Sequence, residues 1–341
     1  MAEVSVAILG LGRLGTSIGL ALKRYNEQGK QHQFKISGYD GTSSTAKSAQ
    51  KIGAIDNIAG RPEMAAKDKD IVVMALPYAE VEVAYDFIAS SMRAGAVILD
   101  SSPLCQTSLE YAKKYLSDDI HVICIRPIIN PAYLFDGADT HENGSVDYFK
   151  NGTLLLMPSV KAIKEAIELA ADFGSILGMR VHYYDPAEHD GLMTATDTMA
   201  SVLGTAYFYS MTKANGWQDA QRLTNPSFGM LTHKLFDTHP DDLRDLWMNN
   251  SDGLVSHIDG VMTQLKELRT AIMTKDRDAI EFVLEASSKE YESWYNRRYN
   301  NRWQDDERFE SQSPGVGAMM GNMVGGFFGN FRVGNKKDDK E

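Results

Sequence analysis

A glycine-rich run near the start of the chain has the residue types and spacing to hold the phosphates of a dinucleotide. Its three glycines stand in the hexapeptide GLGRLG, directly between the apolar run Val4–Leu9 and the helical pattern Thr16–Tyr25. The first glycine permits a tight turn, the second lets the backbone approach a pyrophosphate, and the third lets helix and strand pack closely. Free N–H groups and the positive dipole end of the helix then bind the phosphates. The cofactor-binding candidates in this run are Gly10, Gly12, Arg13, Leu14 and Gly15.

An acidic residue at the end of the next predicted strand completes the dinucleotide pattern. The run FKISGYD ends in Asp40, 25 residues after Gly15, and the following GTSSTAK carries no arginine. The carboxylate of Asp40 can accept hydrogen bonds from both ribose hydroxyls and would repel a 2′-phosphate. We therefore predict NAD as the cofactor and favour it over NADP. A tight turn that binds no ligand is the alternative interpretation.

Residues after the third and fourth apolar runs are expected to border the nicotinamide. Leu76 and Pro77 end the third run, and Ser101 and Ser102 follow the fourth. Because open sheets bind ligands at the carboxyl ends of their parallel strands, these residues should meet at one edge. Leu76, Pro77 and Ser101 are cofactor-binding candidates, and Ser102 is a catalytic candidate.

Five polar residues recur at helical spacing in the second half of the chain, at i, i+3, i+4, i+7 and i+11. This polar stripe consists of Thr194, Asp197, Thr198, Ser201 and Thr205. On an otherwise apolar or small-residue helix it must meet a ligand or form a structural hydrogen-bonding seam, because unpaired burial is costly. Asp197 is its only charge, and burial could raise its pKa toward that of a useful general base. Asp197 and Thr198 are catalytic candidates, although a threonine hydroxyl is a very weak base, and Ser201 is a substrate-binding candidate.

Short apolar runs alternate with helical patterns through the first half and supply the frame for these candidates. The predicted strands are Val4–Leu9, Phe34–Tyr39, Ile71–Leu76, Ala96–Leu99, His121–Ile125, Thr153–Met157 and Arg180–Tyr183. Strands alternating with helices indicate a parallel sheet covered by helices on both faces. After Asp185 the pattern is almost entirely helical. The predicted fold class is therefore α/β plus all-α, with an N-terminal Rossmann doubly wound parallel sheet and a C-terminal helical domain.

We predict three parts: residues 1–185 for the cofactor-binding domain, 186–305 for the helical domain, and 306–341 for a flexible Gly/Met/Phe-rich tail. The tail is either disordered or an apolar segment that docks on a partner. The weakly charged stretch Gly191–Thr212 carries an aspartate and several hydroxyls, so it is predicted to be a buried helix rather than a membrane span.

Composition narrows the possible partners. The chain has 341 residues and a net charge of −11, which argues against a general binder of nucleic acid or anionic membranes. Cys105 and Cys124 are too few for a disulfide scaffold or a cysteine-based zinc site, and the histidines show no metal-ligand spacing. The N-terminus lacks the basic region of a signal peptide. We predict a cytoplasmic protein with no metal, membrane or nucleic-acid partner, and interpret the basic-aromatic stretch 294–303 as a helix end or dimer contact.

The order of these pieces resembles the prephenate/arogenate dehydrogenase family of tyrosine biosynthesis. The matching segments are AILGLGRLGTSIGLAL, SGYD, DIVVMALP, ILDSS, AEHDGLM and GWQDAQRLT. The resemblance implies oxidative decarboxylation, in which a hydride leaves a ring carbinol for NAD while a carboxylate leaves as CO₂. It also implies a small carboxylate substrate and a homodimer formed through the helical domain.

The sequence departs from this family where the reaction takes place. The family's two histidines in a His-Leu-Pro-His run, the first of which hydrogen-bonds the substrate hydroxyl, fall on Thr198 and Ser201. Arg222 matches the family's carboxylate-binding arginine, and Arg126 replaces a family histidine after the fifth predicted strand. Guanidinium groups suit carboxylates, so both are substrate-binding candidates, although salt bridges would also explain them. His189, in the AEHD segment, is interpreted as structural rather than catalytic.

Three hypotheses remain open at this stage. The first is an NAD-dependent dehydrogenase of the prephenate/arogenate type with altered catalytic groups. The second is a related Rossmann dehydrogenase or reductase that acts on a 3-hydroxy acid or an imine. The third is a non-catalytic NAD-binding regulator built on a degenerate enzyme.

Overall fold

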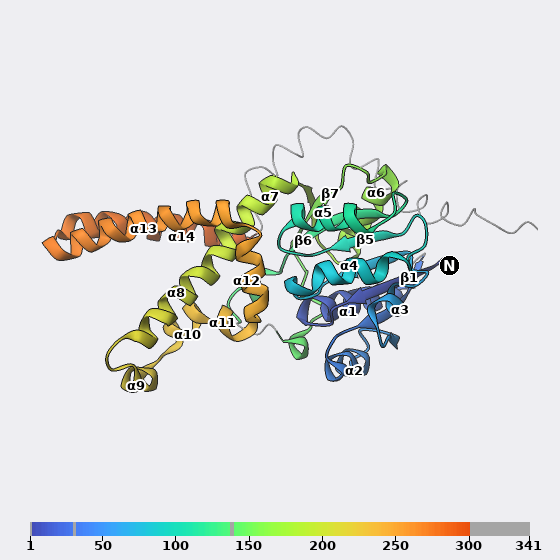
Figure 1. The fold of residues 1–341 in the computed structure, drawn as a ribbon, viewed down its shortest axis with the longest axis horizontal. Helices are drawn as coiled ribbons and strands as arrows, with labels where there is room; N and C mark the ends of the chain where they lie inside the picture. Colours follow the sequence, from blue (N-terminus) through green and yellow to red (C-terminus); the bar gives the residue numbers. More distant parts are fainter. Residues whose placement is uncertain (1, 30–31, 137–139, 301–341) are drawn as a thin grey trace, which may run out of the picture.

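The computed structural model describes residues 2–29, 32–136 and 140–300, and the core of this part is an eight-stranded sheet (Figure 1). The strands are β1 (Ala2–Leu9), β2 (His32–Tyr39), β3 (Asn57–Ile58), β4 (Ile71–Met74), β5 (Val97–Asp100), β6 (His121–Ile128), β7 (Thr153–Pro158) and β8 (Arg180–Tyr183). Their spatial order is β3-β2-β1-β4-β5-β6-β7-β8. The chain therefore winds outward in both directions from β1, and the two halves meet where β1 lies beside β4.

The predicted doubly wound parallel sheet is confirmed, with one exception: β6 and β7 are antiparallel. Parallel neighbours need a crossover connection, usually a long helix. The segment between β6 and β7 contains only the 3-10 turns η2 (Pro131–Tyr133) and η3 (His141–Asn143) among its described residues. The chain then crosses through α6 (Lys164–Ile176) to β8, which pairs parallel with β7.

The seven predicted strands are present with small shifts at their ends, whereas β3 has no counterpart in the prediction. It is only two residues long and exposed, so it carries neither an apolar run nor an alternation that would reveal it. It adds to the edge of the sheet beside β2. The buried central strands, by contrast, are continuous apolar runs, as expected for strands covered on both faces.

Helices cover both faces of the sheet, as predicted. The helices of this part, besides α6, are α1 (Arg13–Glu27), α2 (Ser43–Lys51), α3 (Pro62–Ala66), α4 (Val81–Ala89) and α5 (Cys105–Tyr115), with the 3-10 turn η1 (Tyr78–Glu80). One core contains side chains of α1, α2 and α6 with Val4, Val6 and Ile8 of β1. The other contains side chains of α3 and α4 with Ala7 and Leu9 of the same strand. Alternate residues of β1 thus serve the two layers.

The remainder of the described chain is helical and extends away from the sheet as two arms (Figure 1). Its elements are α7 (Pro186–Met193), the π-helical turn η4 (Thr194–Thr198), α8 (Met199–Lys213), α9 (Trp217–Ala220), η5 (Gln221–Leu223), α10 (Pro226–Thr232), α11 (Lys234–Asp237), α12 (Pro240–Met248), α13 (Ser251–Thr274) and α14 (Arg277–Asn300). One arm is α8 with α9 at its far end, and the other is the hairpin of α13 and α14.

The stretch Gly191–Thr212 differs from the predicted single buried helix. It consists of the end of α7, the π turn η4 and most of α8, and the tyrosines 207 and 209 of α8 are exposed in the single chain. Within the described residues, no helix combines the length and apolarity needed to cross a membrane. The predicted tail, residues 306–341, lies outside the described residues.

Candidate active site

A cavity of about 390 Å³ lies where the carboxyl ends of the central strands face the helical part. Its sheet side, which we term the cofactor wall, is formed by the glycine loop, Asp40, residues 75–78 and Ser101. A second group of lining residues, which we term the reaction wall, consists of Arg126 at the end of β6 with Asp197, Thr198, Ser201 and Lys234 of the helical part. One cavity therefore combines the two sets of candidates that lie far apart in the sequence.

The glycine loop has a geometry that only small residues allow. Gly10 has a φ of +91°, and a Cβ there would lie 2.1 Å from the carbonyl oxygen of Ala75. A Cβ on Gly15 would lie 1.9 Å from the carbonyl oxygen of Gly10, so this glycine serves packing and does not line the cavity. At Gly12, by contrast, nothing lies within 4 Å of the Cβ position. The backbone at Gly12 thus faces open space, as the close approach of a pyrophosphate requires.

The N-terminus of α1 is free to receive an anion. Gly12 caps the helix without a side-chain hydrogen bond, and the first turn contains no acidic residue. Uncapped N–H groups and the helix dipole together favour a phosphate at this position. The residues of the cofactor wall therefore fit a dinucleotide.

Arg13 lines the cavity but is held by a network of its own. Its guanidinium donates to both carboxylate oxygens of Asp136, at 2.9 and 2.6 Å, and to the carbonyl of Asn143 at 3.2 Å. The rings of Tyr133 and Tyr148 lie 5.0 and 4.7 Å from its Cζ. Through these contacts the buried side chain of Arg13 connects the glycine loop to the segment between β6 and β7.

Asp40 lies at the cavity end of β2, where a ribose is expected. Its Oδ2 accepts a hydrogen bond from the backbone N–H of Leu11 at 2.8 Å, and its Oδ1 accepts one from Thr42 at 2.8 Å. Asp40 therefore also fixes the glycine loop. Burial, followed by the charges of Asp242 and Asp40, raises the pKa of the Glu80 carboxyl, which shows that negative charge gathers at this end of the cavity.

Of the candidates that follow β4 and β5, Leu76, Pro77 and Ser101 line the cavity and Ser102 does not. The hydroxyl of Ser101 donates to the carbonyl of Met74 at 2.7 Å. The hydroxyl of Ser102 donates to the buried carboxylate of Asp100 at 2.5 Å. The predicted catalytic position of Ser102 therefore has no geometric support, because its side chain turns into the sheet instead of the cavity.

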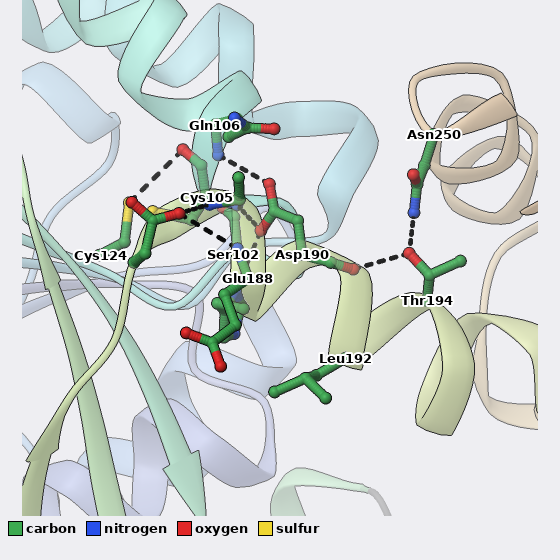
Figure 2. Close-up of polar contacts among 12 residues, drawn as sticks. Ser102, Cys105, Gln106, Cys124, Glu188, Asp190, Leu192, Thr194 and Asn250 are labelled. Carbon is green, nitrogen blue, oxygen red and sulfur yellow. Dashed lines mark hydrogen bonds and ion pairs between the residues drawn. The ribbon is translucent and has the colours of Figure 1, made fainter. Parts of the chain in front are cut away.

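Hydrogen bonds at the join between the sheet and the helical part position the start of η4 (Figure 2). Asp185 caps α7 by accepting from Ala187 at 2.8 Å. The carboxylate of Asp190 accepts from the backbone N–H groups of Cys105 and Gln106, at 2.7 and 2.9 Å, and so caps α5. Thr194 donates to the carbonyl of Asp190 at 2.6 Å and accepts from Asn250 of the helical part. These bonds fix where η4 begins.

The π turn η4 carries part of the polar stripe into the cavity. Residues 194–198 form i→i+5 bonds, so one turn is widened relative to an α-helix. Such turns are rare and occur frequently at functional sites. Asp197, Thr198 and Ser201 line the cavity, whereas Thr194 and Thr205 do not. The stripe is thus partly cavity-facing and partly a structural seam.

Asp197 is the centre of a three-residue ion pair. Its Oδ2 lies 3.3 Å from Nη2 of Arg126, and its Oδ1 lies 3.6 Å from Nζ of Lys234. Burial alone would raise the pKa of Asp197, but the attraction of Arg126 and Lys234 outweighs it, and the net result is a lowered pKa. The expected rise in pKa is therefore wrong. Asp197 remains ionised and is a weak base.

Thr198 and Ser201 complete the reaction wall. The hydroxyl of Ser201 donates to the carbonyl of Thr198 at 2.6 Å and accepts from the indole N–H of Trp247 at 3.0 Å. Both side chains are buried. Ser201 is thus a positioned hydroxyl that ties α8 to α12.

Four cavity-lining polar residues of the helical part were missed from the sequence: Lys234, Asp237, Thr238 and Asp242. They lie around α11 and at the start of α12, in a region without a recognisable motif. Asp237 pairs with His233 at 3.3 Å, and Asp242 accepts from the backbone N–H of Ala79 at 2.8 Å. The only sequence signal in this region was the His239-Pro240 turn, which predicts the start of a helix but indicates no functional residue.

Two other candidates lie away from the cavity. Arg222, in η5, is exposed and does not line the cavity of its own chain, so the structure does not join it to Arg126. His189 is buried, and its Nδ1 lies 2.9 Å from the Asp190 carboxylate, in agreement with a structural role. Within the described residues, no group of three or more His, Cys, Asp or Glu is arranged to hold a metal ion.

The fold and the cofactor wall define a class: a dinucleotide-dependent dehydrogenase of the Rossmann type with a helical second part. Comparison with known families narrows this class. Residues 18–183 match the family model described as "Prephenate dehydrogenase, nucleotide-binding domain", and residues 185–286 match "Prephenate dehydrogenase, dimerization domain". The chain therefore belongs to the prephenate dehydrogenase family, and the predicted resemblance is confirmed.

Curated relatives and solved structures agree with this assignment. The chain is 24% identical over 295 residues to prephenate dehydrogenase of Bacillus subtilis, covering 84% of this chain and 75% of that protein. It is 22% identical over 280 residues to cyclohexadienyl dehydrogenase of Zymomonas mobilis, covering 80% and 90%. A structure of prephenate dehydrogenase from A. aeolicus, in complex with hydroxyphenyl propionate and NAD+, has a TM-score of 0.71 at 18% identity, covering 86% of this chain and 99% of that one. Because the identity to this A. aeolicus structure is only 18%, the match shows a shared fold.

Proposed function

We propose that the protein is an NAD-dependent dehydrogenase that oxidises a small carboxylate-bearing alcohol of the prephenate/arogenate type, with loss of a carboxylate as CO₂. Membership of the prephenate dehydrogenase family supports the reaction class. The observation that carries the proposal is the single cavity, with a phosphate cradle on one wall and the cations of Arg126 and Lys234 on the other.

The roles of the cofactor wall follow from its geometry. When bound, the nicotinamide of NAD accepts the hydride of the carbinol. The N–H groups at the start of α1 hold the pyrophosphate, and Asp40 accepts hydrogen bonds from the ribose hydroxyls. Asp40, with Glu80 and Asp242 nearby, would repel a 2′-phosphate, which favours NAD over NADP. Leu76 and Pro77, which line the cavity, would border the nicotinamide ring.

The charged side chains of the reaction wall indicate how it would bind a substrate carboxylate. Arg126 and Lys234 share one carboxylate, so a substrate carboxylate can compete with Asp197 for either cation. A guanidinium fork binds such a group through two parallel hydrogen bonds. Ser201 and Thr198 offer hydroxyls to the polar groups of the substrate. Arg222 could act on substrate only if a second subunit brought it to the cavity.

We further propose a homodimer, a division at about residue 185, and a cytoplasmic location. The helical part matches the family's dimerization domain. Its arms expose large apolar residues in the single chain, among them Leu265, Ile272, Phe282 and Leu284. Exposed large apolar side chains that gather on one part of a protein are typical of a protein interface.

The test is direct. NAD and NADP are titrated by fluorescence, and NADH formation is then followed with prephenate, arogenate and a panel of 3-hydroxy acids. We expect tighter binding of NAD and turnover of prephenate or arogenate. Turnover of a 3-hydroxy acid alone would support a related dehydrogenase instead. Tight NAD binding without turnover of any substrate would support a non-catalytic NAD-binding regulator and contradict the proposal.

A further inference from the structure

One helix of the helical part contacts both walls of the cavity. This helix is α12, which lies between α8 and the sheet (Figure 1). Asp242, Leu246 and the C-cap Asn249 stand at i, i+4 and i+7, so they share one face of the helix. This face packs against η1, the turn that directly follows Pro77 of the cofactor wall.

Asp242 supplies the cap that η1 lacks. The residue before η1 is Pro77, which makes no side-chain cap hydrogen bond. Oδ1 of Asp242 accepts from the backbone N–H of Ala79 at 2.8 Å, and the Asp242 side chain is buried. The first N–H groups of a helix have no partner within it, and a carboxylate forms strong, charge-assisted hydrogen bonds with them. The position of the turn after β4 therefore depends on a side chain 163 residues later in the chain.

Two further contacts join α12 to the same turn. Nδ2 of Asn249 donates to the hydroxyl of Tyr78 at 3.0 Å, and Leu246 packs with Tyr78 and Leu104 in a buried apolar cluster. Burial raises the pKa of Tyr78 to about 12, so this hydroxyl is neutral and serves as a hydrogen-bonding group. Because Tyr78 itself lines the cavity, these contacts connect α12 directly to the cofactor wall.

The opposite contacts of α12 hold the reaction wall. The indole N–H of Trp247 donates to Oγ of Ser201 at 3.0 Å, and Ser201 donates to the carbonyl of Thr198 at 2.6 Å. Asn250, just after the helix, donates to the hydroxyl of Thr194. Thr194 and Thr198 are the first and last residues of the π turn η4. Both ends of this turn are thus connected to α12.

We propose that α12 sets the distance between the two walls, and that Asp242 and Trp247 are positioning residues for hydride transfer. This inference rests on the proposed function. The hydride passes directly from the carbinol carbon to the nicotinamide, so the reacting atoms must approach to about 3–3.5 Å. The cofactor and the substrate are bound by different walls, and their separation depends on the element that contacts both. A misplacement of about 1 Å can cost about 100-fold in rate.

The first test compares Asp242→Leu with Asp242→Asn, which loses the charge but keeps an acceptor for Ala79. Asp241→Leu is the matched control, because Asp241 lies in the same turn of α12 but pairs with exposed Arg244. We expect Asp242→Leu to lose about tenfold or more in kcat, with NAD affinity within about threefold. Asp242→Asn and Asp241→Leu should keep kcat within about threefold of the wild type. Equal losses in Asp242→Asn and Asp242→Leu, or no loss in either, would overturn the proposal.

The second test cuts the bridge at its other end. Trp247→Phe keeps an aromatic ring but removes the N–H group that binds Ser201. We expect a loss in kcat of about tenfold here too. The double variant Asp242→Leu/Trp247→Phe should lose no more than the larger of the two single losses, because either cut already releases one wall from the other. Losses that multiply would indicate two independent local effects and contradict the bridge.

Hydrogen exchange with mass spectrometry tests the bridge without turnover. In the NAD-bound protein, Trp247→Phe should speed exchange in the peptide over residues 76–81, although the hydrogen bond that it removes lies at the reaction wall. Asp241→Leu should leave this exchange unchanged. Unchanged exchange in Trp247→Phe would overturn the bridge. If the wild type turns over none of the tested substrates but Trp247→Phe shows faster exchange, the proposed function fails while the bridge stands.

Discussion

The two walls of the cavity are built on different physical bases. The cofactor wall depends on backbone: three glycines, an uncapped helix N-terminus and a carboxylate that fixes the loop. The reaction wall depends on side chains that converge from β6, η4, α8 and α11. The glycine loop of the cofactor wall is formed by residues close together in the sequence, and its backbone tolerates almost no added side-chain atom. The reaction wall is formed by residues far apart in the sequence, and other residue types can take their places. This difference explains how a chain can keep its cofactor motif while its reaction residues depart from the family pattern.

The largest effect is expected from a single methyl group in the cofactor wall. In Gly15→Ala the Cβ would lie 1.9 Å from the carbonyl oxygen of Gly10. Overpacking of this kind costs about 1–3 kcal/mol of folding free energy, and the displaced loop should lose most of its affinity for NAD. Thermal unfolding and NAD fluorescence titration measure both effects.

Gly12→Ala is the matched control, because its Cβ meets nothing within 4 Å. We expect an unchanged melting temperature and about tenfold weaker NAD binding, since the methyl group occupies the space for the pyrophosphate. Equal melting temperatures for Gly15→Ala and the wild type would contradict the packing role.

The next effect tests the reaction wall. Asp197→Asn leaves Arg126 and Lys234 without their shared anion. We expect a loss of turnover of about 100-fold or more, with NAD affinity within about threefold, or roughly 0.6 kcal/mol. Asp245→Asn, which removes one exposed partner of Arg244, is the control. Normal turnover by Asp197→Asn would show that the ion-pair centre has no part in the reaction.

A smaller effect is expected on cofactor choice. Asp40→Asn keeps an acceptor for the glycine loop but removes the charge that faces a 2′-phosphate. We expect the ratio of NAD to NADP affinity to fall by about tenfold. Adding Glu80→Gln should lower it further, because it removes a second carboxyl group that lies close enough to Asp40 to interact with its charge. A ratio unchanged in both variants would place cofactor choice elsewhere in the cavity.

The smallest effect concerns stability at low pH. The folded-state pKa of Asp197 is lowered, so its ion pairs stabilise the protein above the unfolded-state pKa and are lost as pH falls through the folded-state value. The melting temperature of the wild type should therefore exceed that of Asp197→Asn at pH 7. The difference should shrink below about pH 4. A difference that grows on acidification would contradict the assigned ion pairs.

Local sequence patterns were sufficient to predict most strands of the sheet and the glycine loop. Continuous apolar runs predicted the seven longer strands, and GLGRLG between a strand and a helix predicted the loop. Asp40 was found by its distance along the chain. These features depend on backbone conformation and sheet topology, which short segments encode. The replacement of the family's histidines was also visible in the sequence, because it is a difference in residue type.

The contacts between side chains of distant segments became visible only in the folded structure. Helical spacing placed Asp197 on a polar stripe, but only the fold brought it between Arg126 and Lys234, which reversed the expected direction of its pKa shift. Ser102 turned toward buried Asp100, and Arg222 lay outside the cavity of its own chain. The antiparallel β7 and the π turn likewise arise from how distant segments pack. Charge interactions depend on distances between residues that the sequence separates, so no local pattern could reveal them.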